Sequence, residues 1–101
     1  IKSAGNRISP QEVEEAAIAT GLVAEAVALG VAHPRLGQAV HLVVRGSGDA
    51  AQAELPKRLQ RDLPNFMQPQ HIHWREAMPL NPNGKIDRTA LQAELNQEFV
   101  Q

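Results

Sequence analysis

Hydrophobic positions recur at helical spacing early in the chain. One face of this stretch is formed by Val13, Ala16, Ala17 and Thr20. Ser9 provides a capping hydroxyl, Pro10 suits the first helical position, and Glu12 lies three residues after the cap. Gly21 is the residue type that ends helices. The pattern predicts an amphipathic helix that starts at Pro10 and ends before Gly21.

Two runs rich in Ala, Val and Leu follow, over residues 25–32 and 38–45. The second run alternates between two faces, with Ala39, His41 and Val43 on one and Val40, Leu42 and Val44 on the other. Residues 33–37, His-Pro-Arg-Leu-Gly, have the composition of a turn. The two runs are therefore predicted to form an antiparallel hairpin.

The rest of the chain contains a predicted helix, a short strand and a final helix. The first of these, over 51–62, presents Leu55, Leu59 and Leu63 at intervals of four, with Pro56 near its predicted start. Residues 71–75 are expected to form a third strand of the same sheet. The stripe predicted for the last helix is Leu91, Leu95 and Phe99, with Asp87 as its cap.

The first eight residues read as two short extended arms around a Gly5-Asn6 turn. The whole pattern predicts an α+β fold, with a small antiparallel sheet of about three strands, helices packed on it and an N-terminal β-hairpin. We expect a single domain, 1–101, that consists of the hairpin (1–9), an α/β core (10–76) and a loop with the last helix (77–101).

Composition excludes several functional classes. A net charge of −1 and three aromatic residues give no footprint for nucleic acid, and no apolar run approaches the ~20 residues of a membrane span. The absence of cysteine excludes disulfides and thiolate chemistry, which fits a cytoplasmic protein. Ile1-Lys2 resembles the middle of a strand and no initiator Met is present, so we expect a piece of a larger polypeptide.

Local motifs for metal binding or catalysis are weak. A phosphate-binding P-loop at Gly84-Lys85 is excluded, because that motif needs glycine at Pro79 and Ser or Thr at Ile86. His71 and His73 share a strand face, but two ligands do not make a metal site, so both are interpreted as polar residues on a solvated face. The remaining candidates are read as structural or solvated: His33, His41, Ser3, Ser9, Ser47, Glu12, Glu14 and Glu15.

Two turns combine a glycine, an asparagine and a cation, at residues 5–7 and 83–85. Taken alone, each is predicted to be an ordinary solvated turn, since such residues dominate turns. Their sequence context changes this interpretation. IKSAGNRISPQEVE (1–14), LPNFMQP (63–69) and MPLNPNGKIDRTAL (78–91) resemble, in this order, three segments of the mobile C-terminal domain of adenylate-forming ligases. This family comprises acyl-CoA synthetases, adenylation domains of nonribosomal peptide synthetases, and luciferases.

The resemblance implies a two-step reaction. A carboxylic acid and ATP first give an acyl-adenylate and pyrophosphate; the C-terminal domain then rotates, and the thiol of coenzyme A or of a carrier protein attacks the adenylate. The resemblance also implies that ATP and Mg²⁺ are bound mainly by an N-terminal adenylate-binding domain of the same polypeptide, so this fragment alone is expected to be inactive.

Six residues receive roles by this resemblance. Lys85 is the catalytic lysine of adenylation, and Asn83 and Gly84 support its loop. An ammonium group suits this step because it offsets the repulsion between a carboxylate and a phosphate. In the second step, Gly5 and Lys2 serve the thioester-forming channel, and Arg7 contacts the nucleotide phosphate.

Three interpretations remain open. IKSAG resembles acyl-CoA ligases more than peptide synthetase adenylation domains, which more often carry a basic residue before that glycine. A peptide synthetase adenylation domain is the first alternative, and a free-standing, non-catalytic interaction module of the same fold is the second.

Overall fold

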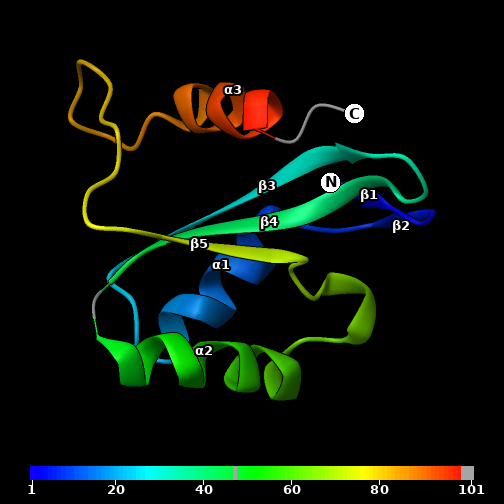
Figure 1. Ribbon diagram of the computed structural model, residues 1–101, viewed down its shortest axis with the longest axis horizontal. Helices are drawn as coiled ribbons and strands as arrows, with labels where there is room; N and C mark the ends of the chain where they lie inside the picture. The colour runs from blue at the N-terminus through cyan, green and yellow to red at the C-terminus, as the bar shows by residue number, and fades with distance from the viewer. Residues whose placement is uncertain (47, 99–101) are drawn as a thin grey trace.

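The central sheet separates three helices into two layers (Figure 1). The computed structural model describes residues 1–46 and 48–98. The elements in chain order are β1 (Lys2–Ser3), β2 (Asn6–Arg7), α1 (Pro10–Ala19), β3 (Glu25–His33), β4 (Gly37–Arg45), α2 (Asp49–Asp62), a 3-10 helix η1 (Asn65–Met67), β5 (His71–Arg75) and α3 (Arg88–Glu98). This arrangement confirms the predicted α+β class, with helices packed on a three-stranded sheet and a separate N-terminal hairpin.

The strands of the central sheet lie in the order β3-β4-β5, and they correct one detail of the prediction. β3 and β4 form the expected antiparallel hairpin, but β5 pairs with β4 in parallel. The reason is the connection: α2 crosses over between β4 and β5, and a strand that returns after such a crossover runs parallel to the first.

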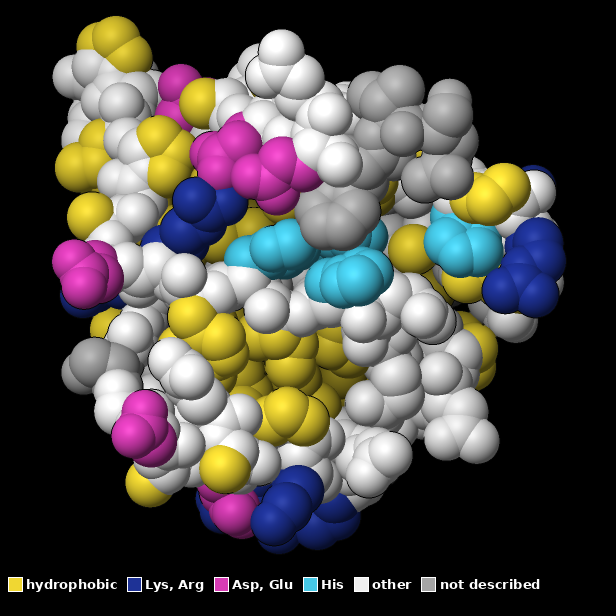
Figure 2. Space-filling model, viewed as in Figure 1, with side chains coloured by type: hydrophobic (Ala, Val, Ile, Leu, Met, Phe, Trp, Pro, Cys, Tyr) yellow, Lys and Arg dark blue, Asp and Glu magenta, His cyan; other side chains and the backbone are white. Residues whose placement is uncertain are grey.

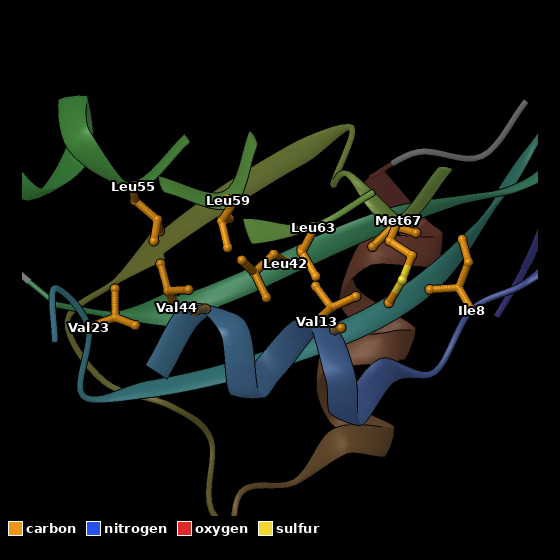
Figure 3. Packing of buried hydrophobic residues seen from close by; sticks show 12 residues of the cluster. Ile8, Val13, Val23, Leu42, Val44, Leu55, Leu59, Leu63 and Met67 are labelled. Atoms are coloured by element: carbon orange, nitrogen blue, oxygen red, sulfur yellow. The ribbon is translucent and has the colours of Figure 1, made fainter. Parts of the chain in front are cut away.

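The predicted alternation of β4 is confirmed by two hydrophobic clusters on opposite faces of the sheet. The face covered by α1 and α2, here called the α1–α2 face, buries Val40, Leu42 and Val44. Figure 3 shows Leu55 and Leu59 of α2 pointing at these strands. The other face, here called the α3 face, buries Val43 together with Leu91 and Leu95. Phe99, the third residue of the predicted stripe, lies outside the described residues, as does Ser47.

Helix boundaries follow the predicted signals, with one exception. Ser9 caps α1, because its hydroxyl accepts a hydrogen bond from the Glu12 N–H at 3.4 Å. Asp87 caps α3 by accepting from the Ala90 N–H at 3.0 Å. Pro56, however, lies in the interior of α2, because the helix begins at Asp49 rather than near residue 51. Its side chain is exposed, so the ring is accommodated on the solvent side.

The turn of the N-terminal hairpin also differs from the prediction. Lys2 pairs with Arg7 and Ser3 with Asn6, so the two-residue turn is Ala4-Gly5 and Asn6 belongs to β2. Both turn residues have positive φ, 51° at Ala4 and 84° at Gly5. Tight hairpins favour this conformation because its twist matches that of the strands, and glycine adopts it without steric cost.

None of the helices in the described residues is long and apolar enough to cross a membrane.

Candidate functional site

The turn that carries Lys85 is closed by hydrogen bonds to Asn81. The side-chain oxygen of Asn81 accepts from the backbone N–H of Asn83 at 2.9 Å and of Lys85 at 3.1 Å. The Asn81 carbonyl accepts from the Gly84 N–H at 2.9 Å, and the Asn81 N–H donates to the Lys85 carbonyl at 2.7 Å. Asn81 therefore organises the whole turn.

Gly84 and Lys85 occupy the positions that this closure requires. Gly84 has a φ of 79°, which favours glycine, and open space surrounds the point where a Cβ would lie. Lys85 is exposed, as are Asn83 and Gly84. A preformed turn of this kind presents an ammonium group outward, where it can enter an anionic site on another body.

The base of the turn is joined to α3 and to the α3 face. The Asp87 N–H donates to the Pro79 carbonyl at 2.8 Å, and Leu80 and Ile86 form an isolated antiparallel bridge. Ile86 is partly buried against the α3-face cluster, and Met78 is buried within it. The turn and the start of α3 thus form one continuous unit.

The N-terminal hairpin is instead fastened to the central hairpin. The Ala4 N–H donates to the Leu36 carbonyl, and the Lys2 N–H donates to the side-chain oxygen of Gln38, both at 2.8 Å. Lys2, Gly5 and Arg7 are all exposed. Apart from its chain neighbours, no part of the protein lies within 4 Å of the point where a Cβ of residue 5 would be. The space beside Gly5 is therefore not filled by this chain.

The structure places these two turns at opposite ends of the molecule. Figure 1 shows the hairpin (blue) at one end and the segment between β5 and α3 (yellow to orange) at the other. Lys2, Gly5 and Arg7 are thus brought together, and Asn83, Gly84 and Lys85 are brought together, but the two groups do not share one site. A single fixed surface cannot bind both groups at once.

The histidines form a cluster that the sequence did not predict. His41 is not isolated: it is 2% exposed, and its Nδ1 lies 2.9 Å from Nε2 of His73. Its ring centroid lies 4.7 Å from that of His71. Figure 2 shows a group of imidazoles near the centre of the view, above a hydrophobic patch, and a further imidazole apart from this group. The parallel pairing of β4 with β5 sets His41 opposite His71, and no periodicity within one strand could indicate this.

Burial is the main cause of a low pKa at His41. Burial and the neighbouring His71, His73 and His33 lower the pKa of His41 to about 4. Burial first, and then His71, also lower the pKa of His73. A hydrogen bond between two neutral imidazoles, with one nitrogen donating and the other accepting, agrees with both shifts. Over residues 1–46 and 48–98, no group of three or more His, Cys, Asp or Glu side chains is arranged to hold a metal ion.

Other polar residues have local structural roles, with one exception. Nδ1 of His33 accepts from the backbone N–H groups of Arg35 and Leu36, each at 3.1 Å, and so closes the turn between β3 and β4. Glu12 and Glu15 lie on the solvated face of α1 as expected. Glu14 does not, because it pairs with Arg88, 74 residues away. Sequence reasoning missed Glu14 and Asn81; an Asn at the start of an NPNG turn is the signal for the second.

Comparison with known proteins agrees with the fold. The profile of the family described as AMP-binding enzyme C-terminal domain matches residues 12–85. Acetyl-coenzyme A synthetase 2 of Pseudomonas aeruginosa is 35% identical over 97 residues, which cover 91% of this chain and 15% of that protein. Tyrocidine synthase 2 of Brevibacillus parabrevis is 35% identical over 91 residues, which cover 90% of this chain and 2% of that protein.

A solved structure supports the same fold. The structure of a fatty acyl CoA synthetase from Mycobacterium tuberculosis superposes with a TM-score of 0.88 at 24% identity, and covers 97% of this chain and 20% of that one. The chain belongs to the AMP-binding enzyme C-terminal domain family, the C-terminal domain of adenylate-forming ligases. It spans only a small part of the length of the relatives it matches.

Proposed function

We propose that this chain is the C-terminal domain of an ATP-dependent, AMP-forming acyl-CoA ligase, in which Lys85 acts in the first step and the Gly5 hairpin in the second. The observation that carries the proposal is the exposed, preformed turn of Asn81–Lys85 at the end of the molecule opposite the hairpin. An N-terminal adenylate-binding domain of the same polypeptide is its partner, and supplies the binding site for the carboxylic acid and ATP.

In the first step, the carboxylate attacks the α-phosphorus of ATP, and the bond from that phosphorus to the pyrophosphate oxygen breaks. Negative charge develops between two groups that are already anionic. The Lys85 ammonium group reaches this charge from its projecting turn and stabilises it electrostatically, without giving up its proton. Because Asn81 holds the turn in one conformation, little order has to be gained when the domains meet.

In the second step, the domain turns so that the hairpin, rather than the Lys85 turn, faces the adenylate. The thiol sulfur attacks the acyl carbon and AMP leaves, while the thiol proton is lost to solvent or to a base outside this chain. The open side of Gly5 leaves room for the thiol-bearing arm to approach the backbone. Lys2 and Arg7 provide cations beside the phosphate.

The experiment separates the two steps in the full-length ligase that carries this domain. Lys85→Ala is expected to abolish carboxylate-dependent exchange between pyrophosphate and ATP, and to spare thioester formation from a preformed acyl-adenylate. Gly5→Leu is expected to give the reverse pattern. Lys57→Ala, which removes an exposed lysine of α2, is the matched control and is expected to leave both steps unchanged. Exchange that survives Lys85→Ala would exclude the assigned role, and equal loss of both steps in each variant would exclude the division between the two turns.

A peptide synthetase adenylation domain is a second candidate, favoured by the similarity to a probable non-canonical nonribosomal peptide synthetase of Salinispora arenicola. The thiol that accepts the acyl group distinguishes this candidate from an acyl-CoA ligase. An acyl-CoA ligase transfers the acyl group to free coenzyme A, whereas an adenylation domain requires a phosphopantetheine-bearing carrier protein. A non-catalytic module would show no exchange activity even in the unmodified full-length protein. The chain of residues 1–101 alone is expected to show none.

A further inference from the structure

An ion pair links the helix that follows the Lys85 turn to the opposite layer of the molecule. Nη1 of Arg88 lies 2.8 Å from Oε2 of Glu14, and Nη2 of Arg88 lies 2.9 Å from Oε1, so both nitrogens and both oxygens are used. Arg88 begins α3 and Glu14 lies in α1, on the other side of the sheet (Figure 1). The contact therefore passes around the edge of β3.

The Glu14 carboxylate is more than a surface partner. Its side chain is 12% exposed, and Oε2 also accepts a hydrogen bond from the Ala28 N–H at 2.8 Å. Ala28 belongs to β3, which pairs with β4 on one side only, so the carboxylate satisfies an N–H at the edge of the sheet. One side chain thus holds α1, β3 and α3 together. The hydrogen bond to Glu14, and then the charge of Glu14, raise the pKa of Arg88.

The ion pair lies close to the Lys85 turn along the chain. Lys85 lies three residues before Arg88, and between them Asp87 both closes the base of the turn and caps α3. Met78 and Ile86 anchor this unit by apolar contacts, which hold position but do not fix an angle. One turn further along α3, Gln92 donates a hydrogen bond to the Gly30 carbonyl of β3 at 2.9 Å. A planar guanidinium bound through two nitrogens fixes orientation as well as distance.

We propose that the Glu14–Arg88 ion pair is a positioning clamp, which orients the start of α3 so that Lys85 projects toward the partner domain in the adenylation step. This inference rests on the role proposed for Lys85. Neither residue touches the substrate; each acts through the direction in which the turn is held.

A second ion pair of the same helix provides a matched control. Arg75 of β5 pairs with Glu94, which lies in the second half of α3. Breaking this pair also removes one attachment of α3 to the body of the domain, but at a point six residues further along α3 than Arg88. If any loss of helix attachment disturbed the Lys85 turn, the two pairs would be equivalent. If orientation at the start of α3 matters, only the first pair should have an effect.

The first measurement is amide hydrogen exchange on the chain of residues 1–101, which needs no activity. Glu14→Gln keeps an oxygen that can accept from Ala28 but removes the charge that binds Arg88. We expect faster exchange at Gly84, Lys85 and Asp87 in Glu14→Gln and in Arg88→Gln, and unchanged exchange there in Glu94→Gln. Equal acceleration by Glu94→Gln, or none by Glu14→Gln, would overturn the proposal.

The second measurement uses the full-length ligase. Glu14→Gln and Arg88→Gln are expected to slow pyrophosphate exchange roughly 10-fold to 100-fold, since a displacement of about 1 Å can have an effect of this size. Thioester formation from a preformed adenylate should be unchanged. Arg88→Lys, which keeps the charge but loses the two-nitrogen contact, should recover only part of the rate, and Glu94→Gln should match the unmodified enzyme.

The two proposals can fail separately. If Lys85→Ala leaves pyrophosphate exchange intact, the proposed function is wrong, and the hydrogen-exchange result still decides whether the clamp exists. If Lys85→Ala abolishes exchange while Glu14→Gln and Arg88→Gln behave like Glu94→Gln, the function stands and the clamp is wrong.

Discussion

The two faces of the central sheet are closed by different chemistry. The α1–α2 face is covered by two helices and is filled with aliphatic side chains, among them Leu42, Leu55 and Leu59. The α3 face is covered by a single helix, and its aliphatic cluster gives way to imidazoles at His41 and His73. Each face also carries one of the two turns: Ile1 and Ile8 attach the hairpin to the first face, and Met78 and Ile86 attach the Lys85 turn to the second.

This difference indicates where the domain can yield. A layer held by many buried aliphatic contacts opens only with global unfolding, whereas a single helix on a smaller cluster can open locally. The proposed catalytic lysine therefore depends on the less strongly held layer. In this layer, directional contacts such as the Asn81 hydrogen bonds and the Glu14–Arg88 ion pair fix the conformation of the Lys85 turn, which apolar packing alone does not.

The largest expected effect on stability comes from truncating one buried leucine on each face to alanine. Leu59 and Leu95 are both fully buried. Truncation of a buried leucine to alanine costs about 2–5 kcal/mol, and more where the surroundings cannot collapse into the cavity. We expect Leu59→Ala to lie near the upper end of this range and Leu95→Ala near the lower end, because α3 alone can shift inward. Urea denaturation of residues 1–101 measures both, and a larger loss for Leu95→Ala would contradict the comparison.

The sequence predicted the α1–α2 face better than the α3 face, for a physical reason. Capping at Ser9 and the spacing of Leu55, Leu59 and Leu63 are local signals, and they sufficed to place α1 and α2. The direction of β5, the environment of His41 and the pairing of Glu14 depend on residues more than 25 positions apart. Such contacts leave no periodicity, so a single sequence does not reveal them.

The candidate site divides in the same way. The candidate residues in the two turns were predicted because their motifs resemble those of a known family. The residues that support them were missed, because Asn81 acts through backbone groups and Glu14 acts across the fold. Positive φ at Ala4 was missed for a related reason: alanine is not a residue type that marks a turn.

The second-largest expected effect is that acid destabilises the α3 face more than the α1–α2 face. The pKa of His41 is about 4 in the folded chain, against an ordinary value of 6.5 for an exposed histidine, so the unfolded chain binds a proton first as pH falls. The contribution of His41 is fully present above pH 6.5 and is lost as pH falls toward 4, by roughly 3 kcal/mol in total. Urea denaturation between pH 7 and pH 4 measures this loss.

His41→Gln is the control for this prediction, since it removes the titrating group but keeps a polar side chain next to His73. The pH dependence of this variant should be flatter, with a residual slope from His73, whose pKa is also lowered. Near-equal slopes for the two proteins would show that other groups cause the acid sensitivity. Hydrogen exchange should show α3 opening before α1 and α2 at low pH.

The smallest expected effect concerns the hairpin on the α1–α2 face. Ala4 adopts a φ of 51°, a left-handed conformation that costs a non-glycine residue about 1–2 kcal/mol. Asparagine tolerates this conformation better, and Asn-Gly is a favoured pair for a two-residue hairpin turn. Ala4→Asn should therefore stabilise the hairpin by about 0.5 kcal/mol, measured as slower exchange of the residue 4 amide, which donates to Leu36.

The control is Ala53→Asn, at an exposed position of α2, which should be mildly destabilising because asparagine is a poor helix former. If both variants stabilised the protein, the gain would be unrelated to the turn. If Ala4→Asn destabilised the hairpin, its conformation would be set by the contacts to Leu36 and Gln38 rather than by the preference of the turn residues.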